Sequence, residues 1–172
     1  NPMNNAQLHR ALVSRELDVA FARPALRDPE FVTKELMEEK LILALPDTVD
    51  TGGRTVAKLE RLETHNLVLY PEHPRPSYAD FVLKAIEGAG FTAPLRLWCM
   101  DLQTALSLVA IGEGVCIVPE SVSTAPRKGM KFLRIEPEIA RTSLSVNHRL
   151  DEQGVHVHNF VKIAQRVARK QF

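Results

Sequence analysis

Short apolar runs alternate with amphipathic stretches along the 172 residues. The apolar runs predict buried strands at 17–22, 41–45, 66–70, 95–100 and 114–118, and two more alternating runs predict strands at 131–135 and 143–146. Between them, apolar residues recur every three or four positions, which predicts helices over 4–15, 77–89, 102–111 and 155–171. Continuous apolar strands separated by helices are typical of parallel sheets covered on both faces. The pattern therefore predicts an α/β fold with parallel pairing, in two closely joined lobes that the chain crosses more than once.

Local chemistry supports the expected helix ends. Asp101 stands where an N-cap would accept a backbone hydrogen bond, and Gly112 and Gly114 are expected to end the same helix. Pro76 and Ser77 open the helix over 77–89 in the order expected of a helix start. The last helix is expected to bury Val157, Phe160, Val161, Ala164, Val167 and Ala168.

Composition and charge exclude several classes of protein. The 22 basic and 21 acidic residues give a net charge of +1, which does not support nucleic-acid binding by this segment itself. Two cysteines exclude a disulfide-rich secreted scaffold and favour a cytoplasmic location. No apolar run approaches the roughly 20 residues of a membrane span, and the residues from Asn1 onward lack a basic and an apolar region, so we expect no signal peptide there. The chain does not begin with Met, so we expect a fragment of a longer protein.

The proline-rich segment 70–78 is the most unusual stretch of the chain. Three prolines between Pro71 and Pro76 stiffen it after a predicted strand, and Ser77 and Tyr78 then start a helix. In open α/β sheets ligands bind where strands end and helix N-termini point, because those termini offer unpaired N–H groups to anions. The segment is therefore either a rigid loop that presents Ser77 and Tyr78 to a small carboxylate, or a simple strand-to-helix turn.

Other polar residues leave similar alternatives. Asp101 is expected to cap its helix rather than take part in chemistry. Gln103 and Thr104 would either donate hydrogen bonds to a ligand or face solvent. Arg23 and Arg75 are possible bidentate partners of a carboxylate, although surface arginines are more common.

Evidence for an enzyme is weak. Cys99 and Cys116 lie in apolar strands, which favours inert core thiols over nucleophiles. His156 and His158 are two residues apart, so they would not share a helical face, and a third metal ligand is not evident. No catalytic motif is present, and we expect no catalytic residues, metal or cofactor.

Several of these segments together resemble a known family. The chain resembles the effector-binding domain of LysR-type transcriptional regulators at residues 17–23, at residues 41–46 and above all at the helix and "GEGVCIVP" segment over 101–119. The resemblance covers nearly the whole chain in order and spacing. The loop from Leu69 to Tyr78 is similar to the branch that responds to aromatic-degradation metabolites.

The resemblance implies two Rossmann-like lobes joined by crossover strands, similar to type 2 periplasmic solute-binding proteins. The lobes would be about 1–38 with 143–172, and 39–142. The effector, a muconate- or benzoate-like anion, would lie between the lobes and would contact Asn4, Pro76, Ser77, Tyr78, Asp101, Leu102 and Gln103, with Thr142 at the crossover. Arg23 matches one of two arginines that some members use in a second site, whereas Met37 stands where the other would align.

The resemblance also implies parts and partners outside this sequence. The winged helix-turn-helix domain that would bind DNA is absent, as are the first strand and helix of the effector-binding domain. Family members form homodimers or homotetramers, act with RNA polymerase and are cytoplasmic, with no membrane partner. The alternative is a periplasmic-type solute-binding protein of a transporter, which shares the two-lobed fold.

Overall fold

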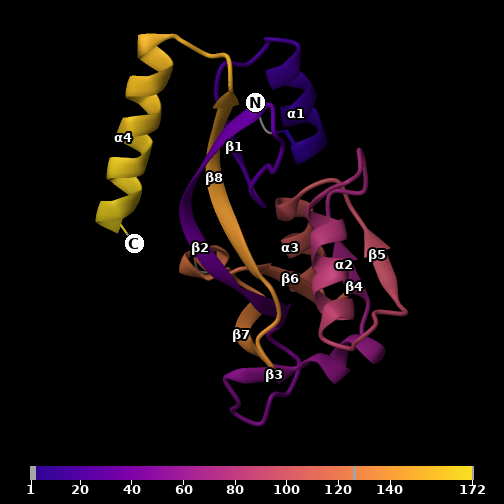
Figure 1. Cartoon of the computed structure of the whole chain (residues 1–172). Helices are drawn as coiled ribbons and strands as arrows, with labels where there is room; N and C mark the ends of the chain where they lie inside the picture. Colours follow the sequence, from indigo (N-terminus) through magenta and orange to yellow (C-terminus); the bar gives the residue numbers. More distant parts are fainter. Residues whose placement is uncertain (1–2, 126, 172) are drawn as a thin grey trace. The chain divides into compact units, whose positions relative to one another are not determined.

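The computed structural model describes residues 3–125 and 127–171 (Figure 1). The chain forms two compact units, Asn1–Glu38 with Thr142–Phe172, and Glu39–Arg141. Strand β2 (Phe31–Pro46) leads from unit 1 to unit 2, and β8 (Arg141–Arg149) leads back. The main sheet has the strand order β1-β8-β2-β7-β3, with β6 paired to β2. The mixed α/β architecture agrees with the fold class predicted from the sequence.

Unit 1 contains α1 (Asn5–Val13), β1 (Ala20–Ala22) and α4 (Val155–Gln171) besides its parts of β2 and β8. β1 pairs antiparallel with β8, with Ala20 opposite Asn147. A small core surrounds α1 and consists of Leu8, Leu12, Ala20, Ala22, Leu26 and Phe31. β1 begins later than the predicted strand because the N–H groups of Glu16 and Leu17 both donate to Ala11 O, at 2.9 and 3.0 Å, and turn the chain.

Arg149, at the end of β8, joins the separate pieces of unit 1. Its guanidinium donates to Leu17 O at 2.7 Å and Leu12 O at 3.2 Å, and it pairs with Glu152 at 2.6 Å. The Arg149 side chain is only 9% exposed. The end of α1, the turn that follows it and the segment after β8 therefore share one buried cation.

The buried face of α4 is narrower than the sequence predicts. Val157, Val161 and Ala168 are buried, but Phe160 and Val167 are 46% and 47% exposed. The prediction was wrong for these two residues, and Ala164 is only half-buried, because the buried side chains follow a single line along the helix. The Phe160 ring instead meets the ring of Phe21 on β1, with centroids 5.9 Å apart.

The described residues of unit 2 form two helices, two short 3-10 helices and five further strands. The helices are α2 (Tyr78–Gly88) and α3 (Leu102–Ala110), and the 3-10 helices are Leu59–Glu63 and Glu120–Thr124. The strands are β3 (Val56–Lys58), β4 (Leu67–Leu69), β5 (Arg96–Trp98), β6 (Cys116–Pro119) and β7 (Met130–Glu136).

Strand directions correct the prediction of parallel pairing. β4 pairs with β5 and β3 with β7 in parallel, but β2 pairs antiparallel with both β6 and β7. Leu43 thus lies opposite Ile117 on one side and Leu133 on the other. The apolar run 41–45 is buried because β2 is an interior strand, and an interior strand can pair in either direction.

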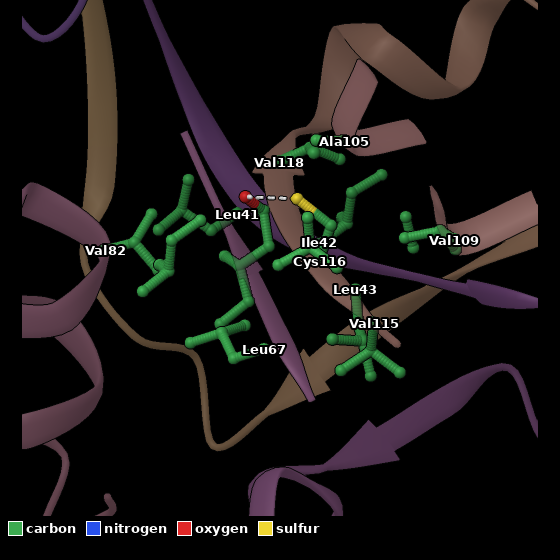
Figure 2. Close-up of a cluster of buried hydrophobic side chains, with 14 of the residues drawn as sticks. Leu41, Ile42, Leu43, Leu67, Val82, Ala105, Val109, Val115, Cys116 and Val118 are labelled. Atoms are coloured by element: carbon green, nitrogen blue, oxygen red, sulfur yellow. Dashed lines mark hydrogen bonds between the residues drawn. The ribbon is translucent and has the colours of Figure 1, made fainter. Parts of the chain in front are cut away.

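The core of unit 2 lies between β2, β4, β6 and the two helices. Figure 2 shows Leu41, Ile42 and Leu43 of β2 among Val82 of α2, Ala105 and Val109 of α3, and other buried side chains. α3 ends near Gly112, whose φ of +93° suits glycine at a helix end. Among the described residues, no helix is long and apolar enough to span a bilayer.

Candidate functional site

Two helix N-termini emerge at one edge of a parallel strand pair in unit 2. β4 and β5 pair in register, with Leu69 opposite Trp98. Beyond their ends the two segments stay joined, because Cys99 N–H donates to Leu69 O at 3.0 Å and Glu72 N–H donates to Cys99 O at 2.9 Å. α2 follows β4 and α3 follows β5. The structure therefore brings the segments that contain Pro76–Tyr78 and Asp101–Gln103 to the same edge.

Ser77 and Tyr78 are both buried at the start of α2. Ser77 is the N-cap residue, and its hydroxyl donates to Pro71 O at 2.9 Å, which closes the proline-rich loop. Tyr78 stacks on Tyr70 with ring centroids 5.2 Å apart and also contacts Phe81. The segment between β4 and α2 is therefore held by a side-chain hydrogen bond and by ring contacts.

The Arg75 guanidinium already binds a carboxylate of the protein, that of Asp80. Arg75 Nε donates to both Asp80 oxygens, at 2.9 and 3.1 Å, and its guanidinium lies over the Trp98 ring, 4.9 Å from the centroid. Asp80 also accepts from Ser77 N–H at 2.7 Å. The hydrogen bond from Arg75 lowers the pKa of the Asp80 carboxyl below its usual value, and the same pair raises the pKa of Arg75.

Asp101 caps α3, as the sequence predicts. Its carboxylate accepts from Thr104 N–H and from the Thr104 hydroxyl, both at 2.9 Å, and the backbone hydrogen bond lowers the pKa of the Asp101 carboxyl. Leu102 packs against the core of unit 2. Gln103 is exposed, and its Oε1 accepts from Arg127 at 2.7 Å.

Two of the predicted residues of unit 1, Asn4 and Arg23, lie near the start of α1. Asn4 is the N-cap, and it exchanges two hydrogen bonds with Gln7, at 2.9 and 3.0 Å. Asn5 Nδ2 donates to Pro24 O at 2.7 Å, so the start of α1 is held against the segment that begins with Arg23. The structure thus brings Asn4 and Arg23 into one region of unit 1.

Thr142 is the second residue of β8 and is 1% exposed. Its hydroxyl oxygen has no hydrogen-bond partner among the described residues. Buried hydroxyls without a partner are uncommon. The role of each predicted residue as a ligand contact stays a prediction.

The cysteine thiols and the His158 imidazole, which the sequence analysis considered as nucleophiles or metal ligands, pack against other residues. Cys99 and Cys116 are both buried, and burial raises the pKa of each thiol. The His158 ring meets the ring of buried His148, with centroids 5.4 Å apart. Within the described part of the chain, no three His, Cys, Asp or Glu side chains come together in a way that could hold a metal ion.

Sequence reasoning missed two residues of this region. Asp80 lies three residues after Ser77, and this Ser-x-x-Asp spacing is a helix-start signal that could have revealed it. Arg127 reaches Gln103 from 24 residues further along the chain, and no local pattern indicates that contact.

The family model described as the LysR substrate binding domain matches residues 1–169. The chain belongs to the LysR substrate-binding domain family. It is 36% identical over 135 residues to the HTH-type transcriptional regulator CatR of Pseudomonas putida, covering 78% of this chain and 46% of CatR. It is 29% identical over 154 residues to a probable cat1 operon transcriptional activator of Acinetobacter lwoffii, covering 89% of this chain and 50% of that protein.

The chain therefore spans about half the length of the curated relatives it matches. Those relatives are transcriptional regulators, which does not favour the alternative of a transporter's solute-binding protein.

Solved structures of the LysR family share the fold. The crystal structure of CbnR, a LysR family transcriptional regulator, superposes with a TM-score of 0.80 at 28% identity, covering 96% of this chain and 57% of CbnR. The BenM effector binding domain with its effector benzoate superposes with a TM-score of 0.83 at 21% identity, covering 98% of this chain and 77% of that one. At that identity the BenM likeness bears on the fold alone.

Proposed function

We propose that this chain senses a small carboxylate for a cytoplasmic LysR-type transcriptional regulator. The observation that supports the proposal most directly is the pair of helix N-termini, those of α2 and α3, at the carboxyl edge of β4 and β5. Helix N-termini favour an anion through their local field and through N–H groups that have no partner within the helix itself. The effector binding domain of BenM, a regulator of the same family, has been solved with its effector benzoate.

The two compact units correspond, in this proposal, to the two lobes of the family fold. Asn4, Arg23 and Thr142 would offer contacts from unit 1, and Pro76–Tyr78 with Asp101–Gln103 would offer contacts from unit 2. The mechanism is a population shift, in which the ligand stabilises the arrangement of the units that it binds better.

The remaining functions belong to parts and partners outside this chain. DNA binding would reside in a winged helix-turn-helix domain, which agrees with the net charge of +1 here. Homodimers or homotetramers acting with RNA polymerase would pass the ligand response to a promoter. The proposal assigns no catalysis to the chain.

A thermal-shift titration with benzoate and cis,cis-muconate tests carboxylate binding. A ligand that binds only the folded state stabilises it by about 2.7 kcal/mol at a hundredfold excess over Kd. The neutral analogue benzamide serves as the charge control. We expect a saturable rise in Tm with at least one carboxylate and none with benzamide. No rise with either carboxylate would contradict the proposal.

A pair of variants on α3 tests the location. Gln103 is exposed in the first turn, and Ser107 is exposed one turn later on the same helix. We expect Gln103→Ala to weaken carboxylate binding several-fold, because it removes an amide donor and the partner of Arg127, whereas Ser107→Ala should bind like the unsubstituted chain. Equal affinities would remove Gln103 from the site.

A further inference from the structure

The Asp80 carboxylate accepts hydrogen bonds from donors that would otherwise be available to a ligand at the start of α2. Its carboxylate accepts from Arg75 Nε at 2.9 and 3.1 Å, from Ser77 N–H at 2.7 Å, and lies 3.3 Å from the Ser77 hydroxyl oxygen. The Ser77 hydroxyl proton has Pro71 O as its nearer acceptor, at 2.9 Å. The charge of Arg75 and the polar groups of Ser77 are therefore already engaged within the protein.

These contacts close the proline-rich loop at both ends. Ser77 joins the end of the loop to its start at Pro71, and Asp80 joins the loop to the first turn of α2. The Arg75 guanidinium fills the space between Asp80 and the Trp98 ring, so the loop is also attached to β5. A planar cation between a carboxylate and an indole face combines bidentate hydrogen bonding with a cation–π contact.

Resting on the function proposed above, we propose that Asp80 is a positioning residue, which holds the Pro71–Ser77 loop in its ligand-binding shape, and that Arg75 serves this internal pair rather than the ligand. The ligand's carboxylate then meets neutral backbone N–H groups of α2 beside a pair, Arg75 and Asp80, whose charges balance each other. Asp80 influences affinity by raising the fraction of molecules whose loop is formed before the ligand arrives.

The expected effect is modest, because the Arg75 and Asp80 side chains are 41% and 32% exposed. Exposed ion pairs and helix caps each shift an equilibrium by a few-fold, so losing this pair should weaken ligand binding by about 3- to 10-fold.

Trp98 gives a direct readout of the internal pair, because it is the only tryptophan in the chain and Arg75 lies on its ring. The experiment compares the unsubstituted chain with Asp80→Asn, Arg75→Gln and the double variant. Glu87→Gln is the matched control, since Glu87 is an exposed carboxylate on the same helix. For each protein, Trp98 emission, Tm, and the Kd for benzoate and cis,cis-muconate by calorimetry are measured.

We expect Asp80→Asn and Arg75→Gln to change Trp98 emission and to weaken binding by similar factors, with the double variant no weaker than either single variant. Glu87→Gln should match the unsubstituted chain. Two independent effects would instead multiply in the double variant.

Three results would overturn the proposal. A much larger loss of affinity in Arg75→Gln than in Asp80→Asn, multiplied in the double variant, would show that Arg75 contacts the ligand. A lowered Tm with unchanged Kd would reduce Asp80 to a structural role. Unchanged Trp98 emission in Asp80→Asn would show that the internal pair does not hold the loop.

If the unsubstituted chain binds neither probe, the proposed function fails for these ligands, and the positioning role fails with it. The emission of Trp98 still decides separately whether the internal pair exists.

Discussion

Gly114 lies where any side chain would collide with a neighbouring backbone. A Cβ at this position would stand 2.4 Å from Asn66 O and 3.1 Å from a methyl carbon of Val68. Asn66 O also accepts from Val115 N–H at 2.8 Å, so the two segments cannot move apart without losing a hydrogen bond. The sequence interpretation assigned Gly114 to the end of α3, but the structure gives that role to Gly112 and makes Gly114 a site of close approach.

Gly114→Ala should therefore destabilise the fold by about 1–3 kcal/mol, the usual cost of overpacking. Gly88→Ala is the matched control, because a Cβ at Gly88 meets nothing within 4 Å and the residue ends a helix, where alanine is tolerated or favourable. Chemical denaturation of both variants measures the free energy of unfolding. Similar values for the two variants would contradict the predicted clash.

The Asp101 carboxylate should make the stability of the fold depend on pH in the acid range. Its pKa is lowered in the folded state by the hydrogen bond from Thr104 N–H, so its charged form stabilises the fold above the ordinary carboxyl pKa. This contribution disappears as the pH falls through the lowered value. Asp101→Asn keeps an acceptor oxygen but cannot titrate. We expect its Tm to fall less than that of the unsubstituted chain from about pH 5 to pH 2, and parallel Tm curves would rule this out.

At the scale of elements, Arg149 holds unit 1 together. It bonds to the end of α1 and to the turn before β1, and it pairs with Glu152 after β8. Removing it leaves buried carbonyl oxygens and a nearly buried carboxylate without their cation.

Arg149→Met should cost about 3–5 kcal/mol, as is usual when one partner of a buried pair is lost. Arg15→Met makes the same replacement in an exposed pair, with Asp151, and should cost at most about 1 kcal/mol. Denaturant titration followed by circular dichroism compares the two variants. A loss in Arg149→Met as small as that in Arg15→Met would show that Arg149 is not structurally required.

Local signals predicted the helices well, because capping residues and apolar spacing depend on near neighbours. The helix expected over 102–111 is observed as Leu102–Ala110. The first half of β2, by contrast, was not predicted, because residues 32–38 mix polar and apolar side chains and are only half-buried or exposed. Pairing direction was predicted only in part, since an interior strand is apolar whichever way its neighbours run.

The candidate site was likewise predicted only in part from the sequence. Its helix starts at Ser77 and Asp101 follow from the sequence, whereas the pairing of Arg75 with Asp80 on Trp98 depends on how β5 meets the loop. Sequence alone left Arg75 as a possible ligand contact, and the structure shows its partner.

At the scale of the whole molecule, two continuous strands belong to both units. β2 and β8 each begin in one unit and continue in the other. A chain joined in this way should unfold cooperatively, because a strand that loses its order in one unit is covalently continuous with the same strand in the other.

The variant Arg149→Met tests whether the two units unfold together. The substitution lies in unit 1, while Trp98, the only tryptophan, lies in unit 2. We expect Trp98 emission and far-UV circular dichroism to report the same lowered Tm in this variant. Independent units would instead give an unchanged Trp98 transition beside an earlier one in circular dichroism.

Binding of a small carboxylate is the property on which the proposed function of this member of the LysR substrate-binding domain family depends. Isothermal titration calorimetry of the chain with benzoate, cis,cis-muconate and neutral benzamide tests it most directly. We expect saturable heat, with one site per chain, for at least one carboxylate and none for benzamide. No saturable heat with either carboxylate, or equal binding of benzamide, would contradict it.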